Sequence, residues 1–307
     1  MTISQATFAY VAQLVHERAG IHLEPGKEYL VESRLAQPAR ECGATDVDTF
    51  VARLRAHPTP ATVEEVVEAM TTNETSWFRD VAPFDALREH VVPQVRATRP
   101  SGPLRIWSAA CATGQEPYSI AMTLADLAAG DCDVLATDLS PRALERGREG
   151  HYTSLEMNRG MPAAALVRHF RRSGSGWQVS DALRSRVRFA HHNLLGAPPA
   201  WRTFDVVFLR NVLIYFDLAT RVRVLDQVLR SLQPGGWLVL GSAETTLGVH
   251  EGFERVAAGA ATIFRAVPVP AHAVTPVAAL WAPGVHVPAV PVATATGLPT
   301  PRGAGPL

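Results

Sequence analysis

Polar side chains stand where several apolar segments end, and these are the positions where chemistry is expected. The segment DVLATD (133–138) ends in Asp138, and FDVVFLR (204–210) ends in Arg210, which Asn211 follows. Parallel α/β sheets bind ligands beyond the carboxyl ends of their strands, so these groups should gather at one edge. A buried strand that ends in Arg-Asn is costly unless both side chains find partners. A ligand site is therefore favoured there, with an isolated structural Arg–carboxylate pair as the alternative.

The loop after the segment LRIWSA (104–109) has the small residues that let a backbone approach a ligand. It reads ACATGQEP over 110–117, and Gly114 permits a tight turn before a helix. The loop lacks the G-x-G-x-x-G pattern, so a dinucleotide site is only weakly indicated. Glu116 near the helix start suits a ligand with positive charge better than a pyrophosphate. A carboxylate that favours the helix dipole explains Glu116 equally well, and both explanations stay open.

Two of the strand ends suggest a nucleoside. Asp138 lies 24 residues after Gly114, where a carboxylate accepts hydrogen bonds from ribose hydroxyls. The alternative is an Asp that caps the helix beginning near Ser140, but position and spacing favour ribose. Further along, the Asn193 side chain can bond to an adenine edge and Leu194 can pack on the ring. An ordinary loop asparagine is the alternative there.

Upstream, the segment TTNETSWFRD (71–80) places six polar residues and two aromatic residues ahead of Arg79. One explanation is a turn between helices with Thr and Asn as caps. The other is a loop that covers a bound cofactor.

The elements that must position these residues differ along the chain. Residues 1–98 show apolar residues at 3.6-residue spacing, which predicts helices, and Pro58 and Pro60 separate two of them. Beyond them strands alternate with helices, which predicts a mostly parallel, doubly wound sheet. Asp217 is expected to cap a helix that Pro234-Gly235-Gly236 ends. The expected strands are 104–109, 133–138, 187–190, 204–210, 236–241 and 261–266, and the expected helices include 115–129 and one that begins after Ser140.

Two segments interrupt this alternation. Residues 151–187 are polar and Arg-rich, with a turn at Gly174 and Gly176, and they look like a small inserted subdomain. Residues 267–307 contain nine prolines, one Arg and no acid, and are expected to be disordered. The predicted organisation is a helical domain (1–98), an α/β domain (99–266) and this tail.

Composition argues against several classes of protein. The 307 residues carry 29 basic and 29 acidic side chains, and this zero net charge argues against a non-specific nucleic-acid binder. Three cysteines without a C-x-x-C pair make a disulfide framework or a Cys-based zinc site unexpected, and no metal is expected. No secretory signal and no long apolar run is recognisable, so the chain is expected to be cytoplasmic, without direct membrane insertion.

Taken together, the motifs resemble the CheR-type chemoreceptor glutamate methyltransferases. The resemblance covers about residues 5–266 and rests on TTNETSWFRD, RIWSAACATGQEPYSIAM, ATDLS, HNLL, FDVVFLRNVLIYFD and PGGWLVLGSAE, in family order. It implies a helical N-terminal domain, a Rossmann-like class I methyltransferase domain with a small inserted β-subdomain, and S-adenosylmethionine as the cofactor. Two departures are Gln115, where the family often has an acid, and Trp77, where Phe is common.

The resemblance also implies site residues. Tyr215 matches a tyrosine placed near the transferring methyl group, and Arg96 is a weaker match to an active-site arginine because no motif fixes it. The implied cofactor contacts are Asn73, Thr75, Arg79, Glu116, Asp138, Asn193, Leu194, Arg210 and Asn211.

The implied acceptor is a glutamate on the cytoplasmic helical domain of a methyl-accepting chemotaxis receptor. The stretch 170–189 looks shorter than in relatives that dock a receptor's C-terminal pentapeptide, so no such tether is expected. The enzyme is expected to be a monomer and to bind no nucleic acid. A methyltransferase for another protein or a small molecule, and a non-catalytic cofactor-binding adaptor, are the alternatives.

The predicted second helix offers two explanations of its charges. It carries Lys27, Arg34 and Arg40 beside three glutamates. A basic docking face for acidic receptor helices is one explanation, and a solvated mixed face is the favoured one.

Overall fold

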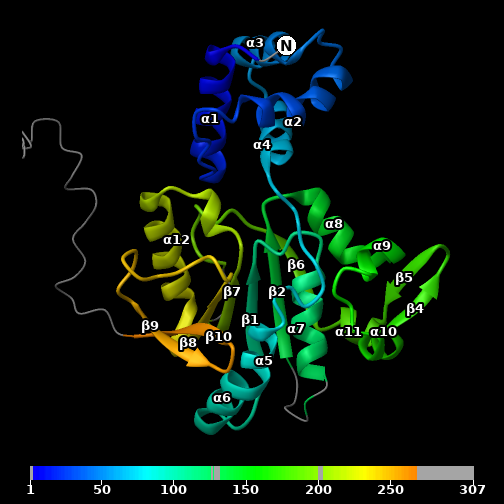
Figure 1. Ribbon diagram of the computed structural model, residues 1–307, viewed down its shortest axis with the longest axis vertical. Coiled ribbons are helices and arrows are strands. Elements are labelled where there is room, and N and C mark those ends of the chain that lie inside the picture. The colour runs from blue at the N-terminus through cyan, green and yellow to red at the C-terminus, as the bar shows by residue number, and fades with distance from the viewer. Residues whose placement is uncertain (1–2, 126, 128–131, 200–202, 268–307) are drawn as a thin grey trace, which may run out of the picture. The chain divides into compact units, whose positions relative to one another are not determined.

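Figure 1 shows the computed structural model of the chain, which describes residues 3–125, 127, 132–199 and 203–267. Apart from Val267, the Pro-rich tail expected over 267–307 lies outside the described residues. In the part that is described, helices come first and an α/β sheet follows, as predicted.

The N-terminal helices surround one apolar core. They are α1 (Gln5–Ala19), α2 (Glu28–Glu41), α3 (Val47–Ala56) and α4 (Pro60–Met70). Ser4 caps α1 by accepting a hydrogen bond from the Thr7 backbone N–H at 3.2 Å. Gly20 ends α1 at a φ of 73°, a left-handed conformation that glycine adopts without strain. Every one of these helices contributes valines to the core, and leucines of α2 and α3 and Phe50 of α3 complete it. The core therefore holds the predicted helices together.

Three short helical pieces that follow belong to a second core. They are α5 (Ala82–Ala86), the π-helical turn η1 (Leu87–Val91) and α6 (Val92–Thr98). Phe84, Leu87 and Val95 bury their side chains in the same core as the sheet residues Ile106 and Phe208. The core of the N-terminal helices ends at Met70. The expected domain boundary at residue 98 marks the point where helices give way to alternating strands and helices. The change from the first core to the second lies earlier, near residue 71.

A seven-stranded sheet forms the second core (Figure 1). In spatial order its strands are β6 (Val187–His191), β2 (Cys132–Asp138), β1 (Leu104–Ala109), β7 (Phe204–Leu209), β8 (Leu232–Leu240), β10 (Ala261–Ala266) and β9 (Phe253–Ala258). The first five strands run parallel, and β10 runs antiparallel to both neighbours. Neighbouring residues such as Ile106 and Trp107 face opposite sides, as the pleat of a strand requires. The predicted doubly wound sheet is confirmed, while β9 was not predicted.

Helices cover both faces of this sheet (Figure 1). They include α7 (Gln115–Ala125), α8 (Pro141–Glu149) and α12 (Leu218–Ser231). α7 and α8 share a face with α5, and α12 covers the other face. The Asp217 side chain caps α12, as predicted, by accepting from the Thr220 N–H at 2.8 Å. The end of α12 was predicted wrongly, because Leu232 already pairs with Phe204 and Pro234 lies within β8.

The inserted segment forms a small antiparallel sheet of its own, which confirms the β-subdomain. Its strands are β3 (His151–Thr153), β4 (Phe170–Ser173) and β5 (Gly176–Val179), in the spatial order β3-β5-β4. The short helices of the segment are α9 (Ser154–Met157), α10 (Ala163–His169) and α11 (Asp181–Arg184). The predicted turn lies between β4 and β5, where Gly174 has a φ of 57°.

Candidate functional site

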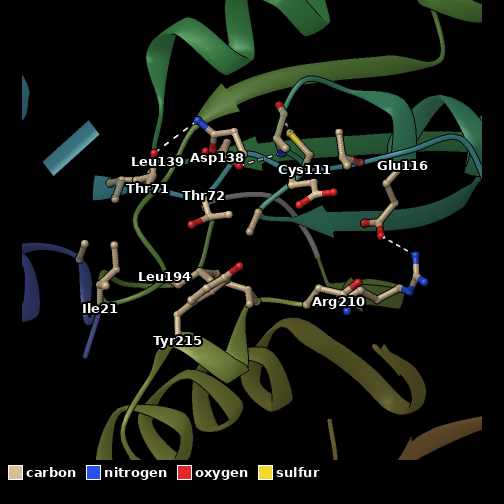
Figure 2. A pocket seen from close by; sticks show the side chains of 18 of the residues that line it. Ile21, Thr71, Thr72, Cys111, Glu116, Asp138, Leu139, Leu194, Arg210 and Tyr215 are labelled. Atoms are coloured by element: carbon tan, nitrogen blue, oxygen red, sulfur yellow. Dashed lines mark hydrogen bonds and ion pairs between the residues drawn. The ribbon is translucent and has the colours of Figure 1, made fainter. Parts of the chain in front are cut away.

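A cavity opens at the carboxyl ends of β1, β2, β6 and β7, where the polar strand-end residues were expected to gather (Figure 2). Its remaining wall includes residues 70–75 and Arg79, and also Ala19 and Ile21 from the N-terminal helical part. The predicted site residues that line it are Asn73, Thr75, Arg79, Glu116, Asp138, Asn193, Leu194, Arg210, Asn211 and Tyr215. Both cores of the molecule therefore contribute to one site.

Arg96 is the predicted site residue that the structure does not bring to this cavity. It lies in the last turn of α6, and its Nη1 donates to the Gly102 carbonyl at 2.8 Å. Gly102 precedes the amino end of β1, whereas the cavity lies at the carboxyl end of that strand. Arg96 therefore does not belong to the residues that form this cavity.

Asp138 fixes the loop that follows β1. Its Oδ2 accepts from the Ala112 backbone N–H at 2.8 Å, and its Oδ1 accepts from the Ser140 N–H at 2.9 Å. Ala110 and Ala112 have φ angles of 58° and 48°, so the loop is held in a conformation that non-glycine residues rarely adopt. Burial raises the pKa of the Asp138 carboxyl, and backbone N–H groups oppose that rise. Asp138 is not the helix cap considered as the alternative, because the Ser140 hydroxyl caps α8 by accepting from the Ala143 N–H at 3.0 Å. The Asp138 carboxylate instead fixes the adjoining loops and lines the cavity.

Glu116 and Arg210 form a buried ion pair on the cavity wall. Glu116 Oε2 lies 3.1 Å from Arg210 Nη1, and Glu116 Oε1 accepts from the Ser108 hydroxyl at 2.7 Å. Arg210 Nη2 donates to the Arg79 carbonyl at 2.7 Å and to Asp80 Oδ2 at 2.8 Å. Burial raises the pKa of the Glu116 carboxyl, and the Arg210 charge opposes that rise. The Arg–carboxylate pair named as the alternative to a site exists, and it lies within the cavity wall.

The segment 71–79 is fixed from the side of the inserted β-subdomain. The Trp77 backbone N–H donates to the Arg159 carbonyl at 3.0 Å, and Arg159 Nη2 lies 2.8 Å from Glu74 Oε1. The Trp77 ring is buried edge-to-face against Tyr152 and Phe170, at ring-centroid distances of 4.8 and 5.3 Å. The segment thus forms a defined wall over the cavity.

Tyr215 projects into the cavity from a 3₁₀ turn, η2 (Leu213–Tyr215) (Figure 2). Glu244 organises this turn, because its carboxylate accepts from the backbone N–H groups of Asn211, Leu213 and Gly241 at 2.7, 2.7 and 2.8 Å. Asn211 itself has a φ of 58°. The sequence analysis did not single out Glu244, although a carboxylate at the end of the motif PGGWLVLGSAE, in the loop after a predicted strand, was an available signal.

Asn193 connects the sheet to the N-terminal helices. Its Nδ2 donates to the Arg18 carbonyl of α1 at 2.6 Å, and its Oδ1 accepts from the Leu195 N–H at 2.9 Å. Next to it, His192 also lines the cavity and was not predicted. Burial, followed by the charge of His191, lowers the pKa of His192.

Two classes of feature are missing from the described part of the chain. Among those residues, no group of three or more His, Cys, Asp or Glu side chains could hold a metal ion. None of the helices found there is long and apolar enough to cross a membrane.

Comparison with known proteins identifies the family. A family model described as CheR methyltransferase, all-alpha domain, matches residues 6–71, and one described as CheR methyltransferase, SAM binding domain, matches residues 73–261. The chain is 38% identical over 274 residues to chemotaxis protein methyltransferase Cher2 of Pseudomonas putida, which covers 87% of this chain and 100% of that protein. It is 37% identical over 253 residues to the chemotaxis protein methyltransferase of Escherichia coli, covering 80% and 86% of the two chains. The chain therefore belongs to the CheR methyltransferase family and is an S-adenosylmethionine-dependent methyltransferase.

Proposed function

We propose that this enzyme transfers a methyl group from S-adenosylmethionine to glutamate side-chain carboxylates of chemotaxis receptors, giving methyl esters for sensory adaptation. Family membership and the names of the relatives, which are chemotaxis protein methyltransferases, support this acceptor. The structural observation that carries the proposal is the cavity, which gathers motif residues at the ends of the parallel strands and is also lined by Ala19, Ile21 and Met70 of the all-alpha domain.

The residues of the cavity fit the cofactor. The small side chains of Ala110 and Ala112 leave the backbone open to a ligand, and the loop is fixed in advance by Asp138. A carboxylate has about four lone-pair positions, so Asp138 can accept from ribose hydroxyls in addition to its two backbone donors. On this proposal Asn193 and Leu194 flank the adenine. The rest of the cofactor is lined by Asn73, Thr75, Arg79, Glu116, Arg210 and Asn211.

The chain's own part in the reaction is to bind and to orient. The bound cofactor supplies a methyl group on a positively charged sulfur, open to in-line attack by a carboxylate oxygen. An unperturbed glutamate has a pKa of about 4.3 and is already ionised near neutral pH, so no residue has to remove a proton. Catalysis then comes mainly from proximity and orientation. The Tyr215 hydroxyl is suited to orient the acceptor carboxylate. An arginine would bind the negative charge of that carboxylate more strongly, and because the reaction neutralises this charge, strong binding of the ground state would slow the transfer.

The experiment that tests this function uses a chemotaxis receptor and a cofactor labelled in its methyl group. Treatment with base should release volatile labelled methanol, which marks a methyl ester. Label that stays on the receptor after base would show that another group is methylated. Absence of label, with normal cofactor binding, would indicate a cofactor-binding adaptor.

We also propose that the enzyme acts as a monomer in the cytoplasm and finds its receptor without a C-terminal pentapeptide tether. The absence of a tether is proposed because the strands β4 and β5 of the inserted subdomain are short, with four residues each. A receptor that lacks its last five residues should be methylated as fast as the intact receptor. A clear loss of rate with the shortened receptor would contradict the absence of a tether.

A further inference from the structure

We infer that Tyr152 of the inserted β-subdomain is a positioning residue of the cofactor cavity, because it holds two walls of that cavity at once. Tyr152 lies in the middle of β3, and its side chain is fully buried. Its hydroxyl donates to the Thr113 carbonyl, in the loop that follows β1, at 2.8 Å. Its ring packs edge-to-face against Trp77 of the segment 71–79, with 4.8 Å between the ring centroids. One side chain outside the cavity thus contacts both of the segments that wall it.

The Tyr152 hydroxyl supplies a donor that the main chain cannot give to the Thr113 carbonyl. At the start of α7, the Tyr118 N–H donates to the Gly114 carbonyl at 3.2 Å, in the helical pattern of four residues. The same pattern one residue earlier would pair the Thr113 carbonyl with Pro117, which has no N–H. Burial raises the pKa of Tyr152 well above its usual value, so the hydroxyl keeps the proton that it donates. The loop therefore depends on the subdomain for this hydrogen bond.

The loop needs support from both sides because its backbone is strained. Ala110 and Ala112 have positive φ angles, a conformation that persists in non-glycine residues only when the surroundings impose it. Asp138 holds the loop from β2 through the Ala112 N–H. Tyr152 holds it from the other side, so closely that a Cβ on Gly114 would lie 2.9 Å from the tyrosine hydroxyl oxygen. Loss of that hydroxyl should let the loop relax and weaken cofactor binding.

The other wall is attached to the subdomain by more than the ring contact. The Trp77 N–H donates to the Arg159 carbonyl, and the Arg159 guanidinium pairs with Glu74. Gly160 packs so tightly there that a Cβ on it would collide with the Trp77 carbonyl. A shift of the subdomain would therefore move both walls. By reciprocity, a cofactor bound between the walls should stabilise the packing of the subdomain.

Tyr118 provides a matched control within the same core. It is buried as well, and its hydroxyl donates to a backbone carbonyl, that of Gly147 in α8, at 2.9 Å. Neither Tyr118 nor Gly147 lines the cavity. Loss of either tyrosine hydroxyl should lower the free energy of unfolding by a similar amount. A difference between the two variants in cofactor affinity therefore reports positioning and not stability.

The test measures binding of S-adenosylhomocysteine by calorimetry, without receptor, for the wild type, Tyr152→Phe and Tyr118→Phe. We expect the affinity to fall about fivefold to tenfold for Tyr152→Phe, which leaves the Thr113 carbonyl without its donor. Tyr118→Phe should stay within about twofold of the wild type, although its melting temperature falls as well. The calorimetric stoichiometry gives the folded fraction of each variant, so partial unfolding is not mistaken for weak binding.

Two results would overturn the inference. One is an affinity of Tyr152→Phe equal to that of the wild type, whether or not its melting temperature falls. The other is an equal loss of affinity in both variants, which would mark a general loosening of the core.

Hydrogen exchange of the wild-type enzyme gives a second measurement, which decides the matter if Tyr152→Phe folds poorly. S-adenosylhomocysteine should slow exchange of the backbone amides of β3 and β5, and should affect β9 and β10, at one edge of the large sheet, less. No slowing in β3 and β5, or the same slowing in all four strands, would contradict the coupling. The inference rests on the proposed place of the cofactor in this cavity. Because the receptor is absent from both measurements, their result is separate from whether a methyl ester is formed.

Discussion

At the scale of single residues, the same side chains that line the cavity also hold the protein together. Asp138 bonds to two backbone N–H groups, and Glu116 pairs with Arg210. Structural and ligand-binding explanations of these residues are therefore compatible, although they look like alternatives in the sequence. A buried carboxylate is expensive to leave unpaired, so a site that needs one must also supply it with partners.

Replacement of Asp138 by Ala should weaken binding of the cofactor by about 10- to 100-fold, because it removes the ribose acceptor and frees two N–H groups of the loop. Titration calorimetry with S-adenosylhomocysteine measures this. Asp133→Ala is the matched control, since Asp133 lies on the same strand and points instead to Arg188, with 3.7 Å between the charged atoms. Equal affinities of the two variants would contradict the role of Asp138.

Replacement of Tyr215 by Phe should lower turnover about tenfold, which corresponds to the loss of one orienting hydrogen bond of about 1.4 kcal/mol. Cofactor affinity should change by less than about twofold, because the ring remains on the cavity wall. Steady-state rates of receptor methylation and calorimetry on the same preparation give both values. Turnover equal to that of the wild type would exclude this function of the hydroxyl.

Residues were predictable where a motif placed them directly after a strand. Asp138 and Arg210 meet at the sheet edge for this reason. Arg96 had no such anchor and lies at the other end of β1. The bond from Asn193 to α1 could not be foreseen, because it joins positions 175 residues apart in the chain.

At the scale of elements, the short turn η2 shows how a side chain far along the sequence fixes a site. Glu244, in the loop after β8, accepts three backbone N–H groups from the ends of β7 and β8. Two of these belong to the segment that leads to Tyr215. The position of Tyr215 thus depends on a residue that need not touch the reacting groups.

Replacement of Glu244 by Gln should reduce turnover and lower the free energy of unfolding by about 1–3 kcal/mol, because one acceptor oxygen becomes a donor facing N–H groups. Chemical denaturation and methylation rates measure the two effects. Glu251→Gln, at an exposed position on the same loop, should change neither. A Glu244→Gln enzyme with normal turnover would show that η2 does not depend on this carboxylate.

Periodicity predicted the elements well where one face or both faces are buried continuously, as in β1 and β7. It did not predict β9, which is a half-exposed edge strand with an irregular pattern of burial. It also could not assign α5 and α6 to a core. Their apolar residues have helical spacing, but the choice of partner is made by long-range packing against the sheet.

At the scale of the whole described molecule, polar contacts join the N-terminal helices to the sheet on several sides of the cavity. Glu68 of α4 accepts from the Ser140 hydroxyl at the start of α8, at 2.7 Å. His16 of α1 lies 2.7 Å from Asp217, the cap of α12. Together with the Asn193 contact, these bonds hold the two cores in a fixed position relative to each other across the cavity.

The contact at Asp217 makes a prediction about acid stability. Partial burial alone would raise the pKa of Asp217, but hydrogen bonds from Thr220 and His16 lower it to about 2. An unfolded Asp has a pKa of about 3.9, so the carboxylate stabilises the fold fully above that value. The stabilisation should be lost as the pH falls from about 4 to about 2. The difference in unfolding free energy between wild type and Asp217→Asn should shrink over that range, and a pH-independent difference would contradict it.

The shared cavity wall has a consequence for how the enzyme responds to its supply of cofactor. A ligand that contacts residues from both cores binds only when they are aligned, so by reciprocity it must also favour that alignment. When cofactor is scarce, the alignment of α4 with the sheet should therefore become less stable, in addition to the loss of reaction. Addition of S-adenosylhomocysteine should stabilise this alignment. The backbone amides of α4, which are remote from the strands, should then exchange hydrogen more slowly with the ligand than without it.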